Sequence, residues 1–305
     1  MSNENPKGLK KYLEYSKERF PIPGIMVYAG TLFYAAFCFG NVVSHAGQVE
    51  WLPSLGGFLV FFMVILHLRI LDEHKDYEDD RIAYPDRLLS SGVITLADLR
   101  RILVAVVLVE VGVSALLGMQ QLVIWGIIFG WSMLMFYEFF ASEFLKKHIG
   151  LYLVSHQLLV PVMVFYAVSL RVDFAGLDGA GFLHILLFSA SIMFATVTYE
   201  IARKTWSQEQ EHELADSYTS EWGIKKAVAV NQLTALCGGA IMVYLYSRYN
   251  AGPVYHSVLA VLFLVFLVTG AVFVKSPSKK MSKMVEAGGM LYMLGLFVNT
   301  IIFFW

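Results

Sequence analysis

Charged side chains are scarce in this sequence. Lys, Arg, Asp and Glu make up 15% of the 305 residues, whereas 57% of the residues are hydrophobic. Soluble domains contain about 45–50% apolar and about 25% charged residues, so this composition excludes an ordinary soluble fold. The formal net charge is −1. Without a basic surface, general electrostatic binding to nucleic acid is also excluded.

Cysteine is nearly absent, and linker-like sequence is missing altogether. Cys38 and Cys237 fall inside apolar runs, where cysteines are usually small buried hydrophobes rather than a disulfide or a metal pair. No Gly-Ser-rich or Pro-rich tract divides the chain. The polar, lysine-rich segment 1–19 has no short apolar core before a cleavage site, so we expect no removable signal peptide. We therefore expect a single domain over residues 1–305.

Long apolar runs are what the sequence has in abundance. Runs of roughly 18–25 apolar residues can cross the hydrocarbon core of a bilayer as helices, and short charged segments separate them here. The pattern predicts an all-α membrane bundle of about nine spans. The third and fourth spans are separated by a few residues from Gly118, which predicts a tight hairpin. The predicted spans are 24–44, 54–71, 97–118, 121–141, 149–170, 180–199, 224–247, 252–274 and 284–305.

Basic residues alternate between the connections. The N-terminus and the second, fourth, sixth and eighth connections are rich in Lys and Arg, whereas the others hold few, among them Arg171 and Arg248. The positive-inside rule then places the N-terminus in the cytoplasm and the C-terminus outside. The basic connections contain Lys7, Lys10, Lys11, Lys17 and Arg19; Lys75, Arg81, Arg87, Arg100 and Arg101; Lys146 and Lys147; Arg203, Lys204, Lys225 and Lys226; and Lys275, Lys279, Lys280 and Lys283.

A first acidic motif, residues 72–80, follows the second predicted span. Asp72, Glu73, Asp76 and Asp80 recur at spacings of three and four, so on a helix their carboxylates lie within an arc of roughly 100°. Like charges on one helical face repel, and a divalent cation removes that cost. Mg²⁺ takes oxygen ligands from one or two carboxylates and completes its shell with water and phosphate oxygens. The alternative is a solvated acidic helix end, partly neutralised by Lys75 and Arg81.

The first motif resembles a known family signature. Asp72-Glu73-x-x-Asp76-x-x-x-Asp80 is similar to the N-D-x-x-D-x-x-x-D pattern of the UbiA superfamily of membrane prenyltransferases, and Arg87-Leu-Leu-Ser-Ser-Gly92 to its R-P-L-x-S-G tail, with Leu88 in place of Pro. The nine predicted helices also fit that family. The resemblance implies Mg²⁺, an isoprenoid diphosphate partner, and motif loops on the cytoplasmic side.

The family carries a second motif, D-x-x-x-D, where this chain has the second motif region, residues 200–216. Glu200 matches the first acid by type, but Lys204 replaces the second. Glu200 and a loop carboxylate could share a metal, or Arg203 and Lys204 could contact the diphosphate directly. The plainer alternative is that both basic residues anchor a helix at the membrane interface. The loop acids, for which a solvated loop is the favoured interpretation, are Glu209, Glu211 and Glu213.

Several further residues are candidates for the site or for its framework. Arg69 lies one turn before the first motif and could reach a phosphate or pair with Glu73. Tyr77 and Tyr199 could stabilise a carbocation through their ring faces, although aromatic residues gather at membrane interfaces anyway. Polar residues inside spans, for which we favour helix–helix hydrogen bonding, are His67, His156, Gln157, Asn231 and Gln232.

These considerations yield a set of candidate site residues. The candidate metal ligands are Asp72, Glu73, Asp76, Asp80 and Glu200. The candidate diphosphate contacts are Arg69, Lys75, Arg87, Arg203 and Lys204. The candidate catalytic residues are Asp76, Asp80 and Tyr199.

The resemblance implies heterolytic cleavage of an allylic diphosphate. Mg²⁺ and cationic side chains would stabilise the leaving diphosphate. Transfer to an aromatic or lipid acceptor would make the protein a prenyltransferase, and attack by the substrate's own double bond a terpene cyclase. A transporter or ion-binding protein is a more distant alternative, which predicts ionisable residues near the middle of several helices. Here the acids cluster at helix ends, with Glu110 and Glu138 as the main exceptions.

Overall fold

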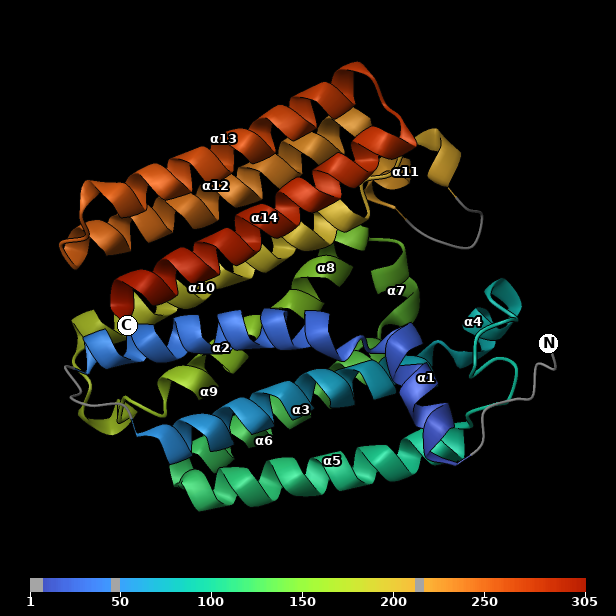
Figure 1. Ribbon diagram of the computed structural model, residues 1–305, viewed down its shortest axis with the longest axis horizontal. Helices are drawn as coiled ribbons and strands as arrows, with labels where there is room; N and C mark the ends of the chain where they lie inside the picture. Colours follow the sequence, from blue (N-terminus) through green and yellow to red (C-terminus); the bar gives the residue numbers. More distant parts are fainter. Residues whose placement is uncertain (1–7, 45–49, 212–216) are drawn as a thin grey trace. The chain divides into compact units, whose positions relative to one another are not determined.

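A computed structural model describes residues 8–44, 50–211 and 217–305, whose regular structure is entirely helical (Figure 1). The helices are α1 (Leu9–Arg19), α2 (Ile22–Val43), α3 (Trp51–Lys75), α4 (Tyr77–Ala83), α5 (Leu96–Leu117), α6 (Met119–Phe136), α7 (Ser142–Lys146), α8 (Ile149–Gln157), α9 (Leu159–Val168), α10 (Gly179–Arg203), α11 (Tyr218–Trp222), α12 (Ile224–Arg248), α13 (Pro253–Lys275) and α14 (Lys279–Phe304). Short 3₁₀ turns occur at Glu138–Phe140, Phe174–Gly176 and Gln208–Gln210. The all-α prediction is confirmed.

Each of the nine predicted spans coincides with a helix or, in one case, with a pair of helices. Among the described residues, 8 stretches are long and apolar enough to cross a membrane. The ninth predicted span is α5, which also carries Arg100, Arg101 and Glu110 and is therefore less apolar. The predicted hairpin is present, because Gly118, at φ 141°, caps both α5 and α6.

One span is interrupted. The stretch Ile149–Val168 consists of α8 and α9, which meet at Leu158. Pro161 lies in the first turn of α9 and has no backbone N–H, so it cannot complete the helical hydrogen bond to Gln157. The break turns Gln157 toward α10, where its Oε1 accepts a hydrogen bond of 2.9 Å from Thr196 Oγ1.

The chain divides into two compact units. The first unit comprises Met1–Gly30 and Val49–Phe139, and the second comprises Thr31–Gln48 and Phe140–Trp305. In the first unit α3 packs against α5 and α6, while Tyr15 of α1 joins a buried cluster with Ile70 and Leu99. The prediction of one domain over the whole chain remains a prediction.

The second unit is a bundle in which α10 packs between α12 and α14, and α13 packs against both α12 and α14 (Figure 1). Gly238 allows α12 to approach α10 closely, because a Cβ there would lie 3.1 Å from the Ser191 carbonyl oxygen. Ser191 Oγ donates a hydrogen bond of 2.7 Å to the Gly238 carbonyl. Close approach through a small residue, with a hydroxyl bridging the two backbones, is typical of helix pairs in membranes.

Polar side chains within the spans tie helices together, as predicted for His67, Gln157 and Gln232. His67 of α3 contacts Glu110 of α5 and Ser132 of α6, and Gln232 Nε2 of α12 donates to the Leu267 carbonyl of α13 at 3.1 Å.

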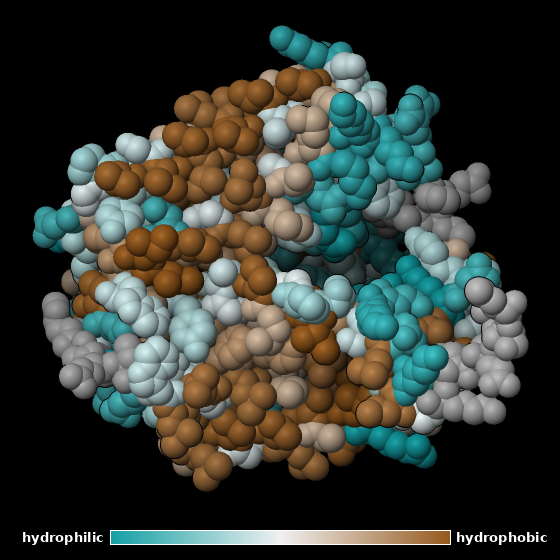
Figure 2. Space-filling model, in the orientation of Figure 1, coloured by the Kyte–Doolittle hydropathy of each residue, from teal (hydrophilic) through white to brown (hydrophobic). Residues whose placement is uncertain are grey.

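In each unit the hydrophilic surface lies near the helix ends and the apolar surface lies along the helices. Figure 2 shows apolar surface along α12 and α13 in the second unit, and hydrophilic surface around α11. In the first unit the surface is apolar along α3 and α5 and hydrophilic near α1 and α4. Apolar shafts with polar ends are expected of helices that span a bilayer.

Candidate active site

The first acidic motif lies at the junction of α3 and α4, in the first unit. Asp72 and Glu73 occupy the last turn of α3, Asp76 caps its end, and Asp80 belongs to α4. Backbone hydrogen bonds run from Asp76 N to Asp72 O (2.9 Å) and from Asp80 N to Asp76 O (2.8 Å), so helical hydrogen bonding continues through the junction. The carboxylates share this region, but their partners divide them into two groups.

Asp72 and Asp76 form the accessible group. Both carboxylates are 51% exposed, and each has an oxygen 3.9 Å from Lys75 Nζ. Partial burial, reinforced by the charges of Asp72, Asp80 and Glu138 and opposed by Lys75, raises the pKa of Asp76 to about 6. Negative charge is thus concentrated where two half-exposed oxygen donors face solvent.

Glu73 belongs to the buried group. Its side chain is 2% exposed, and Oε1 accepts hydrogen bonds from Arg19 Nε at 2.7 Å and from Arg69 Nε at 3.0 Å. Arg69 Nη2 approaches the same oxygen at 2.5 Å. A buried carboxylate requires such partners, since an unpaired charge in an apolar setting is costly. Of the two roles considered for Arg69, the structure contains the pairing with Glu73, and the diphosphate contact stays a prediction.

Asp80 also forms ion pairs with two guanidinium groups. Arg87 Nη1 lies 2.5 Å and Arg19 Nη2 3.3 Å from Asp80 Oδ2. The Arg87 guanidinium stacks on the ring of Tyr84, with Cζ 3.6 Å from the ring centroid, which fixes its plane. Leu88, which replaces the family's proline, retains a backbone N–H that donates to Glu18 Oε2 at 3.3 Å.

Arg19 is a site residue that sequence reasoning missed. In the sequence, Arg19 is one of several basic residues near the N-terminus, and no pattern connects it to the first acidic motif. In the structure its guanidinium joins Glu73 to Asp80, residues on either side of the α3–α4 junction. A contact between residues 54 and 61 positions apart has no local sequence signal.

The second motif region lies in the second unit, at the end of α10. Arg203 Nε and Nη2 donate to the two Glu200 carboxylate oxygens at 2.6 and 2.8 Å, a bidentate pair. Lys204 caps the helix, and its carbonyl accepts a hydrogen bond from Tyr218 N at 3.1 Å. Tyr199 is half-buried one residue before Glu200.

The loop acids divide by position. Glu209 is exposed. Glu211 accepts hydrogen bonds from Ser217 Oγ at 2.7 Å and from Thr219 Oγ1 at 3.0 Å, which ties the loop to α11. Glu213 and the rest of 212–216 lie outside the described residues.

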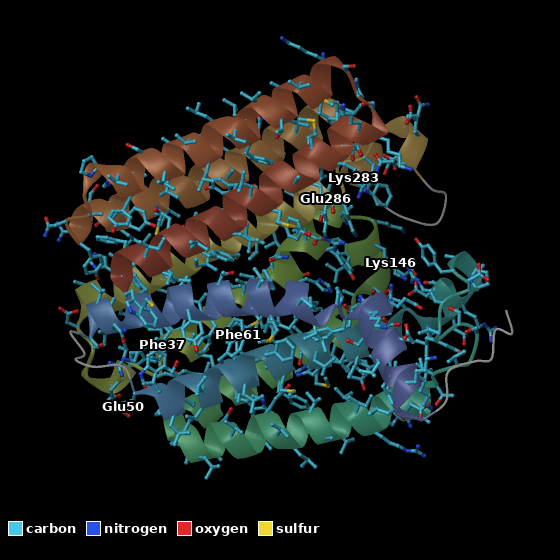
Figure 3. The ribbon with its side chains drawn as sticks, viewed as in Figure 1. Phe37, Glu50, Phe61, Lys146, Lys283 and Glu286 are labelled. Atoms are coloured by element: carbon cyan, nitrogen blue, oxygen red, sulfur yellow. The ribbon has the colours of Figure 1, made fainter. Side chains whose placement is uncertain are left out.

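A second acid approaches this region from another helix. Glu286 of α14 interacts electrostatically with Tyr199, and its Oε2 lies 2.7 Å from Lys283 Nζ; Figure 3 shows Lys283 and Glu286 side by side. Lys283 is one of the basic residues of the eighth connection, whereas Glu286 was not among the candidate site residues. Its three-residue spacing from Lys283 is ordinary for a helix, so no motif marks it.

The donor chemistry of the first motif fits Mg²⁺, although the acids are not gathered into a cage. Within residues 8–44, 50–211 and 217–305, no group of three or more His, Cys, Asp or Glu side chains is close enough to hold a metal. Mg²⁺ needs fewer protein ligands than such a group supplies, since one or two carboxylates, water and phosphate oxygens complete its coordination shell. Asp72 and Asp76, at 51% exposure, are more accessible oxygen donors than Glu73 at 2% and Asp80 at 23%.

Comparison with known proteins identifies the family. A sequence model described as the UbiA prenyltransferase family matches residues 32–298. No curated protein matches the chain. The fold is similar to that of a digeranylgeranylglyceryl phosphate synthase studied in membranes (TM-score 0.65, 17% identity, covering 96% of this chain and 98% of that one). It is also similar to an apo UbiA homologue from Aeropyrum pernix K1 (TM-score 0.65, 14% identity, covering 88% and 98%).

The family match covers most of the chain and includes both motif regions, and the two structural likenesses agree on the fold. Together with the apolar helices, they make the protein an integral membrane protein. The chain belongs to the UbiA prenyltransferase family.

Proposed function

We propose that this protein is a Mg²⁺-dependent prenyltransferase that ionises an isoprenoid diphosphate and transfers the prenyl group to an aromatic or lipid acceptor. The observation that carries the proposal is the half-exposed carboxylate pair of Asp72 and Asp76, next to Asp80 with its guanidinium partner Arg87. Anionic and cationic groups side by side suit a metal-bound diphosphate. The name of the similar synthase, which refers to a digeranylgeranylglyceryl lipid, supports prenyl transfer.

The residues would divide the work of ionisation. Asp72 and Asp76 would hold Mg²⁺, which supplies charge stabilisation to the leaving diphosphate. Arg87 and Lys75 would contact the diphosphate as the allylic C–O bond breaks and its electron pair moves to the phosphate oxygen. Glu73 would hold Arg19 and Arg69 in position, and Asp80 would hold Arg19 and Arg87. Neither carboxylate would bind the metal by itself. The acceptor would then attack the prenyl cation and lose a proton.

In the second unit, Arg203 and Lys204 are the proposed diphosphate contacts and Glu200 the proposed metal ligand. Both carboxylate oxygens of Glu200 accept hydrogen bonds from Arg203. A metal would therefore compete with the Arg203 guanidinium for the Glu200 carboxylate. Tyr199, half-buried beside Glu200, would turn its ring toward the developing cation.

The basic connections support a topology in which the N-terminus and both motif regions are cytoplasmic and the C-terminus is outside. Prenyl diphosphates and Mg²⁺ would then enter from the cytoplasm. Labelling of a cysteine introduced at Trp305 (Trp305→Cys) by an impermeant reagent in intact cells tests this topology.

Pyrophosphate release tests the chemistry. The purified protein would be incubated with Mg²⁺ and geranyl, farnesyl or geranylgeranyl diphosphate, with and without quinone-precursor acceptors. We expect Mg²⁺-dependent release that is lost in Asp72→Asn and Asp76→Asn but kept in Asp79→Asn, an exposed acid of α4. The organic product distinguishes transfer from cyclisation. Wild-type protein that releases no pyrophosphate under any of these conditions contradicts the proposal.

A further inference from the structure

The N-terminal helix α1 lies across the ends of two spans. Near its start Lys11 Nζ binds Asp98 Oδ2 of α5 at 2.6 Å, and at its end Arg19 Nε binds Glu73 Oε1 of α3 at 2.7 Å. Figure 1 shows α1 running steeply across the ends of α3 and α5. Since those helices cross the bilayer, a helix laid across their ends runs along the membrane surface.

The sides of α1 differ in chemistry. Lys11, Tyr12, Tyr15 and Arg19, at helical spacing, face the unit, and Tyr15 is 4% exposed. Leu9 and Leu13, one turn apart on one flank, are 76% and 54% exposed. The helical period puts Glu14 and Glu18 on the opposite flank and the exposed Lys10 and Lys17 on the outer side.

We propose that α1 is an in-plane membrane anchor: Leu9 and Leu13 insert at the boundary of headgroups and acyl chains, and Lys10 and Lys17 bind anionic phospholipid headgroups.

Charge complementarity selects an anionic lipid surface as the occupant. α1 contains four basic and two acidic residues. Lys11 and Arg19 pair with acids of the unit, whereas Lys17, 72% exposed, lies 3.0 Å from Glu14 in a surface pair from which a headgroup phosphate can recruit it. At the start of α5, beside Asp98, the side chain of Arg101 is 81% exposed and adds to the basic surface. An amphipathic helix with leucines on one flank and lysines beside them is the usual form of a surface-bound membrane helix.

Collision measurements on a spin label test the insertion. Labels would be placed at Leu13→Cys and, as a matched control, at Glu14→Cys, in full-length protein carrying Cys237→Ser, in lipid nanodiscs containing phosphatidylglycerol. We expect the label at position 13 to collide with oxygen in preference to a water-soluble nickel chelate, and the label at position 14 to show the reverse. Equal nickel accessibility at the two positions would overturn the proposal.

Lipid charge tests the headgroup contact. In discs of phosphatidylcholine alone, or in a Lys10→Gln/Lys17→Gln background, we expect the nickel accessibility of the label at position 13 to rise severalfold. Unchanged depth under both conditions would overturn the headgroup contact.

One consequence for the active site rests on the proposed function. Seating α1 on lipid holds Arg19 against Glu73 and Asp80, so pyrophosphate release should be faster in phosphatidylglycerol discs than in neutral ones. The depth measurements need no catalysis, so a failure of the proposed function leaves their outcome readable.

Discussion

His67 and Glu110 meet in the interior of the first unit, with His67 Nδ1 3.1 Å from Glu110 Oε1 and both side chains fully buried. Trp125 Nε1 donates to Glu110 Oε2 at 3.0 Å, and His67 Nε2 lies 2.8 Å from Ser132 Oγ. Ser132 Oγ donates to the Phe129 carbonyl at 2.7 Å, so it accepts its hydrogen bond from His67. Glu110, a main exception to the clustering of acids at helix ends, is thus engaged in joining α3, α5 and α6.

Removing Glu110 should destabilise the protein strongly. Glu110→Ala leaves the buried His67 Nδ1 without its partner and removes the acceptor of Trp125 Nε1, and breaking a buried pair typically costs about 3–5 kcal/mol. Glu110→Gln, which keeps an acceptor for Trp125, should cost less. Thermal unfolding in detergent measures the effect, with the exposed Leu108→Ala on the same helix as the control. Equal melting temperatures for Glu110→Ala and Leu108→Ala would show that the contact contributes little.

Metal binding should weaken in acid. Because partial burial raises the pKa of Asp76 to about 6, the carboxylate gains a proton below that pH and loses its donor charge. The Kd for Mn²⁺, measured by paramagnetic resonance as a substitute for Mg²⁺, should be flat above pH 7 and rise about tenfold per unit below pH 6. Asp79→Asn should retain this profile, and Asp76→Asn should bind weakly at every pH. A wild-type Kd that is constant from pH 5 to 8 would rule out Asp76 as the titrating ligand.

Lys204 should contribute to substrate affinity. A charge-assisted contact is worth about 1.5–3 kcal/mol, so Lys204→Ala should raise KM for the prenyl diphosphate at least tenfold while leaving thermal stability nearly unchanged. Lys226→Ala, which removes an exposed lysine near the start of α12, is the matched control. An unchanged KM in Lys204→Ala would favour the alternative that this residue anchors the helix at the interface.

Glu286 should matter for activity and little for folding. Its ion pair with Lys283 lies at the surface, with the Lys283 side chain 63% and the Glu286 side chain 27% exposed. Surface pairs contribute about 0–1 kcal/mol, so Glu286→Gln should melt close to wild type. Its proximity to Tyr199 puts its charge beside the second motif region, and we expect pyrophosphate release to fall about tenfold or more. Glu221→Gln in α11 is the control. Loss of stability without loss of turnover per folded molecule would contradict this role.

Much of the architecture was predictable because its causes are local. Uncharged runs long enough to cross a bilayer identify the spans, and Gly118 identifies the hairpin between α5 and α6. The break at Leu158 also has a local cause in Pro161. The four carboxylates of the first motif were predicted to share one face of a single helix. They are instead divided between two helices, because α3 ends at Lys75 and α4 carries Asp80.

The sequence by itself determined the membrane bundle, the family and the acidic residues of the first motif, because composition and spacing along one chain segment are enough for each. Tertiary structure decided what each acid does. Asp72 and Glu73 are neighbours in sequence, yet one carboxylate is 51% exposed and the other 2%. The difference arises because Arg19 and Arg69 neutralise Glu73 where the chain buries it, and the Arg19 contact exists only after α1 packs across α3 and α5.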